Sequence, residues 1–87
     1  MLQQFRDAWV VIDLASPYVC LGRLGQDDEH YVELFDADLH DLRDTERTRE
    51  NYVADVRATG IKRNRKRVLL RREEIVAIAR FDDVVEL

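Results

Sequence analysis

The sequence predicts a single small domain, residues 1–87, that is mainly β. Apolar stretches with aliphatic and aromatic side chains recur along the chain, as in β-strands, at 9–14, 18–24, 31–37, 67–71 and 75–81. Polar residues, glycine or proline separate several of these stretches. A chain of 87 residues is long enough for only one domain.

The breaks between the strands indicate how they connect. The segment Ala15-Ser16-Pro17 separates the first two strands, which predicts a hairpin. Residues 25–30 form a polar turn before the third strand, whose imperfect alternation indicates a β-bulge. Residues 72–74 form a tight polar turn between the last two strands.

Two helical segments are predicted. Residues 1–8 are expected to form a short helical turn, and 46–58 a helix of about three turns. Thr45 is the predicted N-cap, and Gly60 stands where a left-handed stop is expected. The apolar stripe of this helix consists of Tyr52, Val53 and Val56. Residues 38–44 are too acidic to assign.

The last strand is apolar on both faces. One face carries Ile75, Ala77, Ala79 and Phe81, and the other carries Val76 and Ile78. So small a domain does not easily cover both faces by itself, and exposed apolar edges favour strand addition from a neighbour. The lone Cys20 excludes an internal disulfide. Self-association through the C-terminal strands is therefore predicted.

The formal net charge of −4 is unevenly distributed. Residues 33–55 hold eight acids and three arginines, whereas residues 57–72 hold eight bases and no acid. No segment is apolar enough to span a membrane, and the N-terminus lacks the basic start and apolar run of a signal peptide. The expected compartment is the cytoplasm.

The spacing of several residues resembles the first motif of the Sm-like (LSm) family. In that motif a strand leucine is followed eight positions later by a glycine and ten positions later by a second leucine, as are Leu14, Gly22 and Leu24. Asp27 or Asp28 matches the loop aspartate of the motif. The match continues in the third strand with Leu34, Asp36 and Ala37.

The segment 70–75, Leu-Arg-Arg-Glu-Glu-Ile, resembles the second motif of the family, a hydrophobic residue, Arg-Gly-x-Asn and an aliphatic residue. Arg72 replaces the glycine and Glu74 the asparagine. The base-gripping asparagine of the first motif is replaced by Tyr31 or His30. The chain is thus identified as a divergent, bacterial-type Sm-like protein with an insertion between the two motifs.

The resemblance implies a small, strongly bent five-stranded Sm-like (SH3-like) barrel with a short N-terminal helical turn and a helical insertion before strand 4. It also implies that the fourth and fifth strands pair with neighbouring copies to form a homo-oligomeric ring. The family's usual ligand is single-stranded RNA, held by two loops that correspond here to 27–31 and 71–74. The resemblance transfers the architecture more safely than the ligand.

The expected RNA contacts fall into two groups. The loop group consists of Asp27, Asp28, His30, Tyr31, Arg71 and Arg72, in which aromatic and guanidinium planes stack on bases. The basic run, suited to a phosphate backbone, consists of Lys62, Arg63, Arg65, Lys66 and Arg67.

Two alternatives stay open for these charges. Arg71 can pair with Asp27 or Asp28 of a neighbouring loop and simply stiffen the ring. The basic run can pair with the acidic stretch 36–46 of another subunit. The first hypothesis is therefore a ring that binds single-stranded RNA mainly through backbone charge, and the second is a ring that serves as a protein-interaction scaffold without RNA.

The remaining chemistry-bearing residues favour ordinary roles. Asp36, Asp38 and His40 share one face if residues 36–40 stay extended, but solvated acids are commoner there than a metal site, so no metal or cofactor is expected. Cys20 is predicted to be a small buried hydrophobe, and Trp9 a core or interface residue. No catalytic motif is present, and the chain is not expected to be an enzyme.

Overall fold

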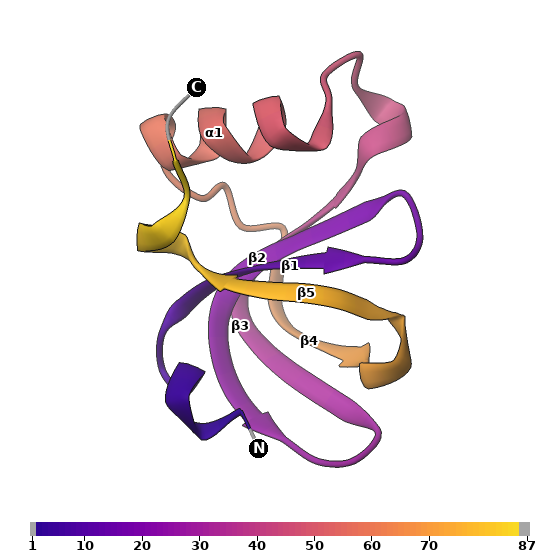
Figure 1. Cartoon of the computed structure of the whole chain (residues 1–87), viewed down its shortest axis with the longest axis vertical. Helices are drawn as coiled ribbons and strands as arrows, with labels where there is room; N and C mark the ends of the chain where they lie inside the picture. Colours follow the sequence, from indigo (N-terminus) through magenta and orange to yellow (C-terminus); the bar gives the residue numbers. More distant parts are fainter. Residues whose placement is uncertain (1, 86–87) are drawn as a thin grey trace.

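The computed structural model describes residues 2–85 as a five-stranded antiparallel sheet with one α-helix (Figure 1). The elements are β1 (Trp9–Leu14), β2 (Tyr18–Asp27), β3 (Tyr31–Asp41), α1 (Arg49–Thr59), β4 (Arg65–Arg71) and β5 (Ile75–Arg80). Short 3-10 helices lie at Gln3–Phe5 (η1), Leu42–Asp44 (η2), Arg72–Glu74 (η3) and Phe81–Asp83 (η4). The predicted mainly β class, with five strands and a helix before the fourth, is confirmed. Among the described residues, no helix has the length and apolar character needed to cross a membrane.

The second and third strands are longer than the sequence indicated. β2 continues to Asp27, and β3 continues through part of the acidic segment to Asp41. This extension is possible because β2 supplies backbone partners along its whole length, with Tyr18 opposite Asp41 and Val19 opposite His40. The register between the two strands shifts twice, in agreement with the predicted irregularity.

The helix starts three residues later than predicted. Thr48 is the N-cap, and its hydroxyl accepts a hydrogen bond from the Asn51 amide at 3.2 Å. The prediction that Thr45 caps the helix is wrong, because residues between η2 and Thr48 form a separate turn in which Thr45 accepts from the Arg47 amide. The predicted stop is confirmed: Gly60 has a φ of +96°, and its amide donates to Val56.

The sheet is open and is not closed into a barrel, contrary to the expectation from the sequence. Its strand order is β4-β3-β2-β1-β5, so β4 and β5 are the two outer strands although they are consecutive in the chain. Only the three residues of η3 join β4 to β5, so the bend of the sheet brings its two borders close together at this end, yet β5 pairs with β1 and not with β4. Each outer strand therefore keeps one edge without a strand partner.

Both faces of the strongly bent sheet are covered in part. The larger cluster of buried residues comprises Val10, Ile12, Leu14, Cys20, Leu24, Val32, Leu34, Ala37 and Leu70. A second cluster lies beneath α1 and comprises Val11, Val19, Leu21, Val53 and Val56. The alternation of β1 thus places Val10 and Ile12 in one cluster and Val11 in the other, which explains why these three consecutive residues are apolar. Cys20 is buried as predicted, and burial raises its pKa to about 12. Trp9 is exposed by 41%, so it is not a core residue.

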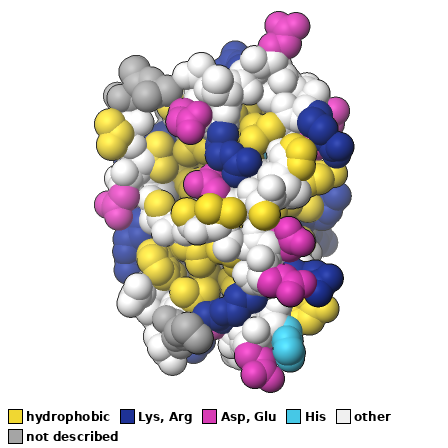
Figure 2. All heavy atoms as spheres, turned by 45° about the vertical axis from the view of Figure 1, so that its right-hand side comes forward, with side chains coloured by type: hydrophobic (Ala, Val, Ile, Leu, Met, Phe, Trp, Pro, Cys, Tyr) yellow, Lys and Arg dark blue, Asp and Glu magenta, His cyan; other side chains and the backbone are white. Residues whose placement is uncertain are grey.

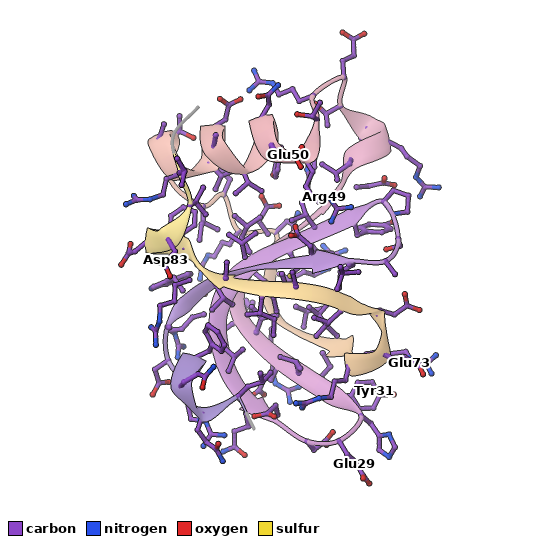
Figure 3. The ribbon with its side chains drawn as sticks, viewed as in Figure 1. Glu29, Tyr31, Arg49, Glu50, Glu73 and Asp83 are labelled. Atoms are coloured by element: carbon purple, nitrogen blue, oxygen red, sulfur yellow. The ribbon has the colours of Figure 1, made fainter. Side chains whose placement is uncertain are left out.

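Arg49 attaches the inserted helix to the β1–β2 hairpin. Its guanidinium donates to the main-chain oxygens of Leu14, Ser16 and Tyr18 at 3.3–3.5 Å. Figure 3 shows Arg49 pointing from the start of α1 toward this hairpin. Because a guanidinium offers several N–H donors in a fixed geometry, this one side chain bonds three carbonyls and holds the helix N-terminus on the sheet.

Candidate functional site

The two loops named by the resemblance lie at the same end of the sheet. Tyr31 pairs with Arg71 across β3 and β4, and the Arg72 amide donates to the His30 carbonyl at 2.8 Å. Figure 3 shows Tyr31 and Glu73 at this end. The fold therefore gathers residues that are some 40 positions apart in the sequence.

Arg72 is held inside the loop cluster. Its Nη1 donates to Asp27 Oδ2 at 2.8 Å and to the Asp28 carbonyl at 2.7 Å. The Asp27 side chain is only 6% exposed, and Arg6 lies 3.6 Å from its other oxygen. Within one chain it is Arg72 that pairs with Asp27, and a pair between Arg71 and an aspartate of a neighbour stays a prediction. Arg72 and Asp27 therefore stabilise the loops, and their low exposure leaves them poorly placed to contact a ligand.

Asp28 shapes the β2–β3 turn. Its Oδ1 accepts from the amides of His30 and Tyr31, both at 2.7 Å, and these bonds lower the pKa of Asp28. The turn projects His30 and Tyr31 outward, and the Tyr31 side chain remains 43% exposed. Of the loop residues, His30, Tyr31 and Arg71 are thus accessible to a ligand.

Acids of the same chain neutralise much of the basic run. Arg63 forms an ion pair with Asp36, and Arg67 Nε donates to Glu33 at 2.5 Å. Inside the subunit the pair of Arg63 with Asp36 already joins this run to the acidic stretch 36–46, and pairing with another subunit stays a prediction. Three bases of this run have no carboxylate partner among the described residues: Lys62, Arg65 and Lys66.

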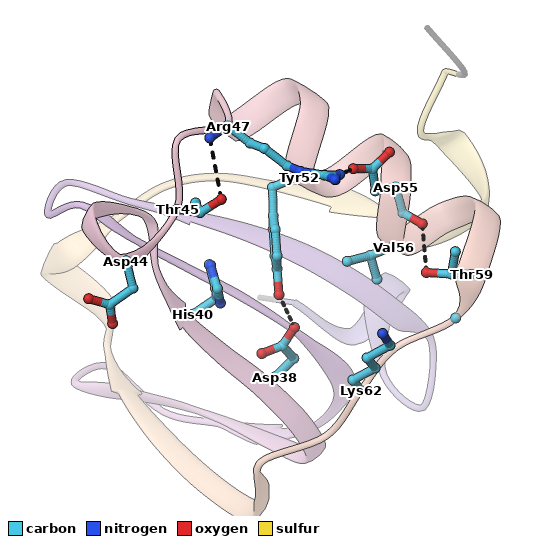
Figure 4. Close-up of a pocket in the computed structure, with 11 residues that line it drawn as sticks. Asp38, His40, Asp44, Thr45, Arg47, Tyr52, Asp55, Val56, Thr59 and Lys62 are labelled. Carbon is cyan, nitrogen blue, oxygen red and sulfur yellow. Dashed lines mark hydrogen bonds and ion pairs between the residues drawn. The ribbon is translucent and has the colours of Figure 1, made fainter.

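A cavity of about 540 Å³ lies between β3, the turn after it and α1 (Figure 4). Its floor is formed by Asp38 and His40, and one side by Tyr52. An ion pair between Arg47 and Asp55 crosses its upper rim. The other residues that line it include Asp44, Thr45, Thr59 and Lys62.

Asp38 is a buried carboxylate without a cationic partner among the described residues. It is 3% exposed, and it accepts hydrogen bonds from the Tyr52 hydroxyl and from Asn64 Nδ2. Burial raises the pKa of Tyr52, and the bond to Asp38 raises it further. Asn64 also bonds the backbone of Leu39 in both directions, at 3.0 and 3.1 Å. This network joins the insertion to β3 at the two ends of α1.

His40 stacks on Tyr52, with ring centroids 4.0 Å apart and an angle of 11° between the planes. Its Nε2 atom is buried and has no hydrogen-bond partner among the described residues. A buried polar atom without a partner costs about 1–3 kcal/mol. The Nε2 atom of His40 is therefore an unsatisfied hydrogen-bonding group in the free protein.

The sequence pointed to this region only in part. Asp38 and His40 do share one face, but Asp36 does not join them, because its φ of +50° turns the strand and its side chain pairs with Arg63. No group of three or more His, Cys, Asp and Glu residues suited to a metal ion occurs in residues 2–85. The contribution of Tyr52 was missed, since a tyrosine in an apolar helical stripe gives no signal that its hydroxyl meets a buried acid.

The sequence matches no protein-family model, and it matches no curated protein.

Proposed function

We propose that this chain is the subunit of a homo-oligomeric Sm-like ring, in which β5 of one copy adds to β4 of the next. The observation that carries the proposal is the strand order, which leaves β4 and β5 at opposite borders of a bent open sheet. Different edges that meet head to tail generate a ring when the rotation closes. Unpaired strand edges favour such addition because they hold free backbone donors and acceptors.

Side chains along the outer strands support this assembly. Val76 on β5 is 70% exposed, and Leu69 on β4 is 47% exposed. Figure 2 shows a band of hydrophobic side chains across the middle of the face on which β5 lies, with charged groups at its borders. Burying these apolar groups against a neighbour is favourable in water.

We further propose that the ring binds single-stranded RNA, mainly through backbone charge. Tyr31 offers an exposed ring for base stacking, and Arg71 lies opposite it across β3 and β4. Arg65 and Lys66 are free of carboxylates among the described residues and are available for phosphates. Repetition around a ring multiplies weak contacts of this kind.

A second candidate is a ring that acts as a protein-interaction scaffold. The ion pairs of Arg63, Arg67 and Arg72 favour it, because each removes a base from the set available to phosphates. The two functions share the ring and differ in the ligand.

Native mass spectrometry of protein purified without nuclease tests the assembly. We expect a closed multimer for the wild type and monomer for Val76→Asp, which puts a charge on the exposed edge strand. Ala58→Asp, at an exposed position of α1, is the matched control and retains the multimer. A wild type that stays monomeric at tens of micromolar would overturn the ring.

Binding to unstructured oligoribonucleotides at several salt concentrations separates the two functions. If RNA is the ligand, the slope of log affinity against log salt is about −0.7 per phosphate neutralised. Arg71→Glu and the double variant Arg65→Glu with Lys66→Glu then each weaken binding at least about tenfold, while Arg57→Glu on α1 has little effect. A ring that binds no oligonucleotide supports the scaffold.

A further inference from the structure

We propose that the cavity between β3 and α1 binds a nucleotide whose base carries an exocyclic amino group. The base stacks beside His40, the amino group donates to Asp44, and the phosphate lies at Lys62. The nucleotide has two possible sources of the same chemistry, an RNA strand and a free mononucleotide. For the first source, the inference rests on the proposed RNA binding.

The size of the cavity suits such a ligand. Its volume of about 540 Å³ lies within the range of roughly 300–1,000 Å³ that is usual for small-molecule sites. The floor is rigid because Asp38 is buried and bonded to both Tyr52 and Asn64. A preformed site of this kind loses little conformational entropy when a ligand enters.

The aromatic pair provides a stacking surface. His40 and Tyr52 are parallel, and both line the cavity. Figure 4 shows Asp44 on the side of His40 that faces away from Tyr52. Unpaired bases are commonly held against histidine and tyrosine rings, so a base at this position continues the stack.

The two ends of the cavity carry opposite charges without partners. Among the described residues, the side chain of Asp44 makes no hydrogen bond or ion pair, and neither does that of Lys62. Figure 4 places these residues at opposite ends, with the aromatic pair between them. A nucleotide has the complementary arrangement, because an exocyclic amino group donates to a carboxylate and a phosphate attracts an ammonium group.

The unsatisfied atom of His40 is consistent with an absent ligand. Its Nε2 is buried in the free protein without a hydrogen-bond partner, which is unusual for a buried polar group. Because Nε2 lies in the plane of the imidazole, a base stacked on the ring does not reach it, and a ribose hydroxyl beyond the edge of the base is the group that supplies the missing partner. Lys62 begins the basic run, so the next phosphates of an RNA strand are directed toward Arg65 and Lys66.

Calorimetric titration of the full chain with AMP, CMP and UMP tests the site. We expect AMP and CMP, which carry exocyclic amino groups, to bind at least tenfold more tightly than UMP. Asp44→Ala removes this preference because it removes the acceptor, Lys62→Glu weakens all three nucleotides but not adenosine, and Asp83→Ala is the matched control. Asp44 and Lys62 are exposed, so both variants are expected to fold. Equal affinity for AMP and UMP, or wild-type affinity in Asp44→Ala, overturns the inference.

Hexanucleotides A6, C6 and U6 distinguish the two sources. If RNA supplies the nucleotide, A6 and C6 bind more tightly than AMP and CMP, and Lys66→Glu weakens only the hexamers. If a free nucleotide is the ligand, the hexamers bind no more tightly than the mononucleotides. The RNA proposal then fails, while the cavity site stands. Tight hexamer binding that is insensitive to the base and to Asp44→Ala retains the RNA proposal and rejects the cavity site.

Discussion

Arg72 donates a hydrogen bond from Nη1 to Asp27 Oδ2 at 2.8 Å, across 45 positions of sequence. The bond joins the end of β2 to the turn that follows β4, and the acid it reaches is almost fully buried. This pair ties the two loops together and gives Arg72 a structural role within the chain.

Replacing Arg72 by alanine is expected to lower the free energy of unfolding by about 1.5–3 kcal/mol, because it removes a hydrogen bond to a charged group and leaves Asp27 less well paired. Arg71→Ala is the matched control, since Arg71 is exposed and, among the described residues, its one ion pair is with Glu73. Its effect is expected within about 0.5 kcal/mol. Urea denaturation with an unchanged m-value measures both, and equal effects would contradict the structural role of Arg72.

Gly22 is required by a close approach of β3. A Cβ at this position lies 3.0 Å from the Phe35 carbonyl oxygen and 3.2 Å from the Ala37 Cα, which are backbone atoms and cannot rotate away. Gly22→Ala is therefore expected to destabilise the fold by about 1–3 kcal/mol. At Gly25 the obstructing atoms belong to the side chains of Glu33 and Phe35. Gly25→Ala is expected to cost less, and thermal unfolding of the two variants tests this order.

Tyr52→Phe removes one of the two donors to the buried Asp38 carboxylate. We expect a loss of about 1–3 kcal/mol in the free energy of unfolding, together with faster hydrogen exchange in α1, which this hydroxyl anchors to β3. Tyr31→Phe is the control, because the Tyr31 ring is exposed. Unchanged exchange in α1 of Tyr52→Phe would show that apolar packing alone holds the helix.

The pair between Asp41 and Arg43 predicts a defined acid dependence. Hydrogen bonds from the Arg43 side chain and amide lower the pKa of Asp41 from 3.8 to about 2. A carboxyl whose pKa is lowered by folding stabilises the fold above its unfolded value and loses that contribution as the pH falls toward its folded value.

The unfolding midpoints of the wild type and Asp41→Asn are therefore expected to differ by a constant amount above about pH 4. The difference shrinks between about pH 4 and pH 2 as Asp41 becomes protonated. Thermal unfolding followed by circular dichroism across this range measures it, with Asp83→Asn as a variant that shows no such convergence. A difference that persists unchanged at pH 2 would rule out this ion pair as its origin.

The sequence by itself determined the elements and their type. Strand alternation, the Ala15-Ser16-Pro17 break and the Gly60 stop depend on local backbone preferences, which act within a few residues. The burial of Cys20 and the apolar stripe of α1 were likewise predictable, because periodicity assigns a side chain to a face.

Only the tertiary structure decided which charges are available and where a ligand can fit. Arg72 with Asp27 and Arg63 with Asp36 are pairs between distant segments, and a basic run looks the same in sequence whether or not acids neutralise it. The cavity arises because α1 places Tyr52 over Asp38 and His40. Such contacts depend on how the insertion docks on β3. Local periodicity shows which face of an element is apolar, but it does not specify which element packs against that face.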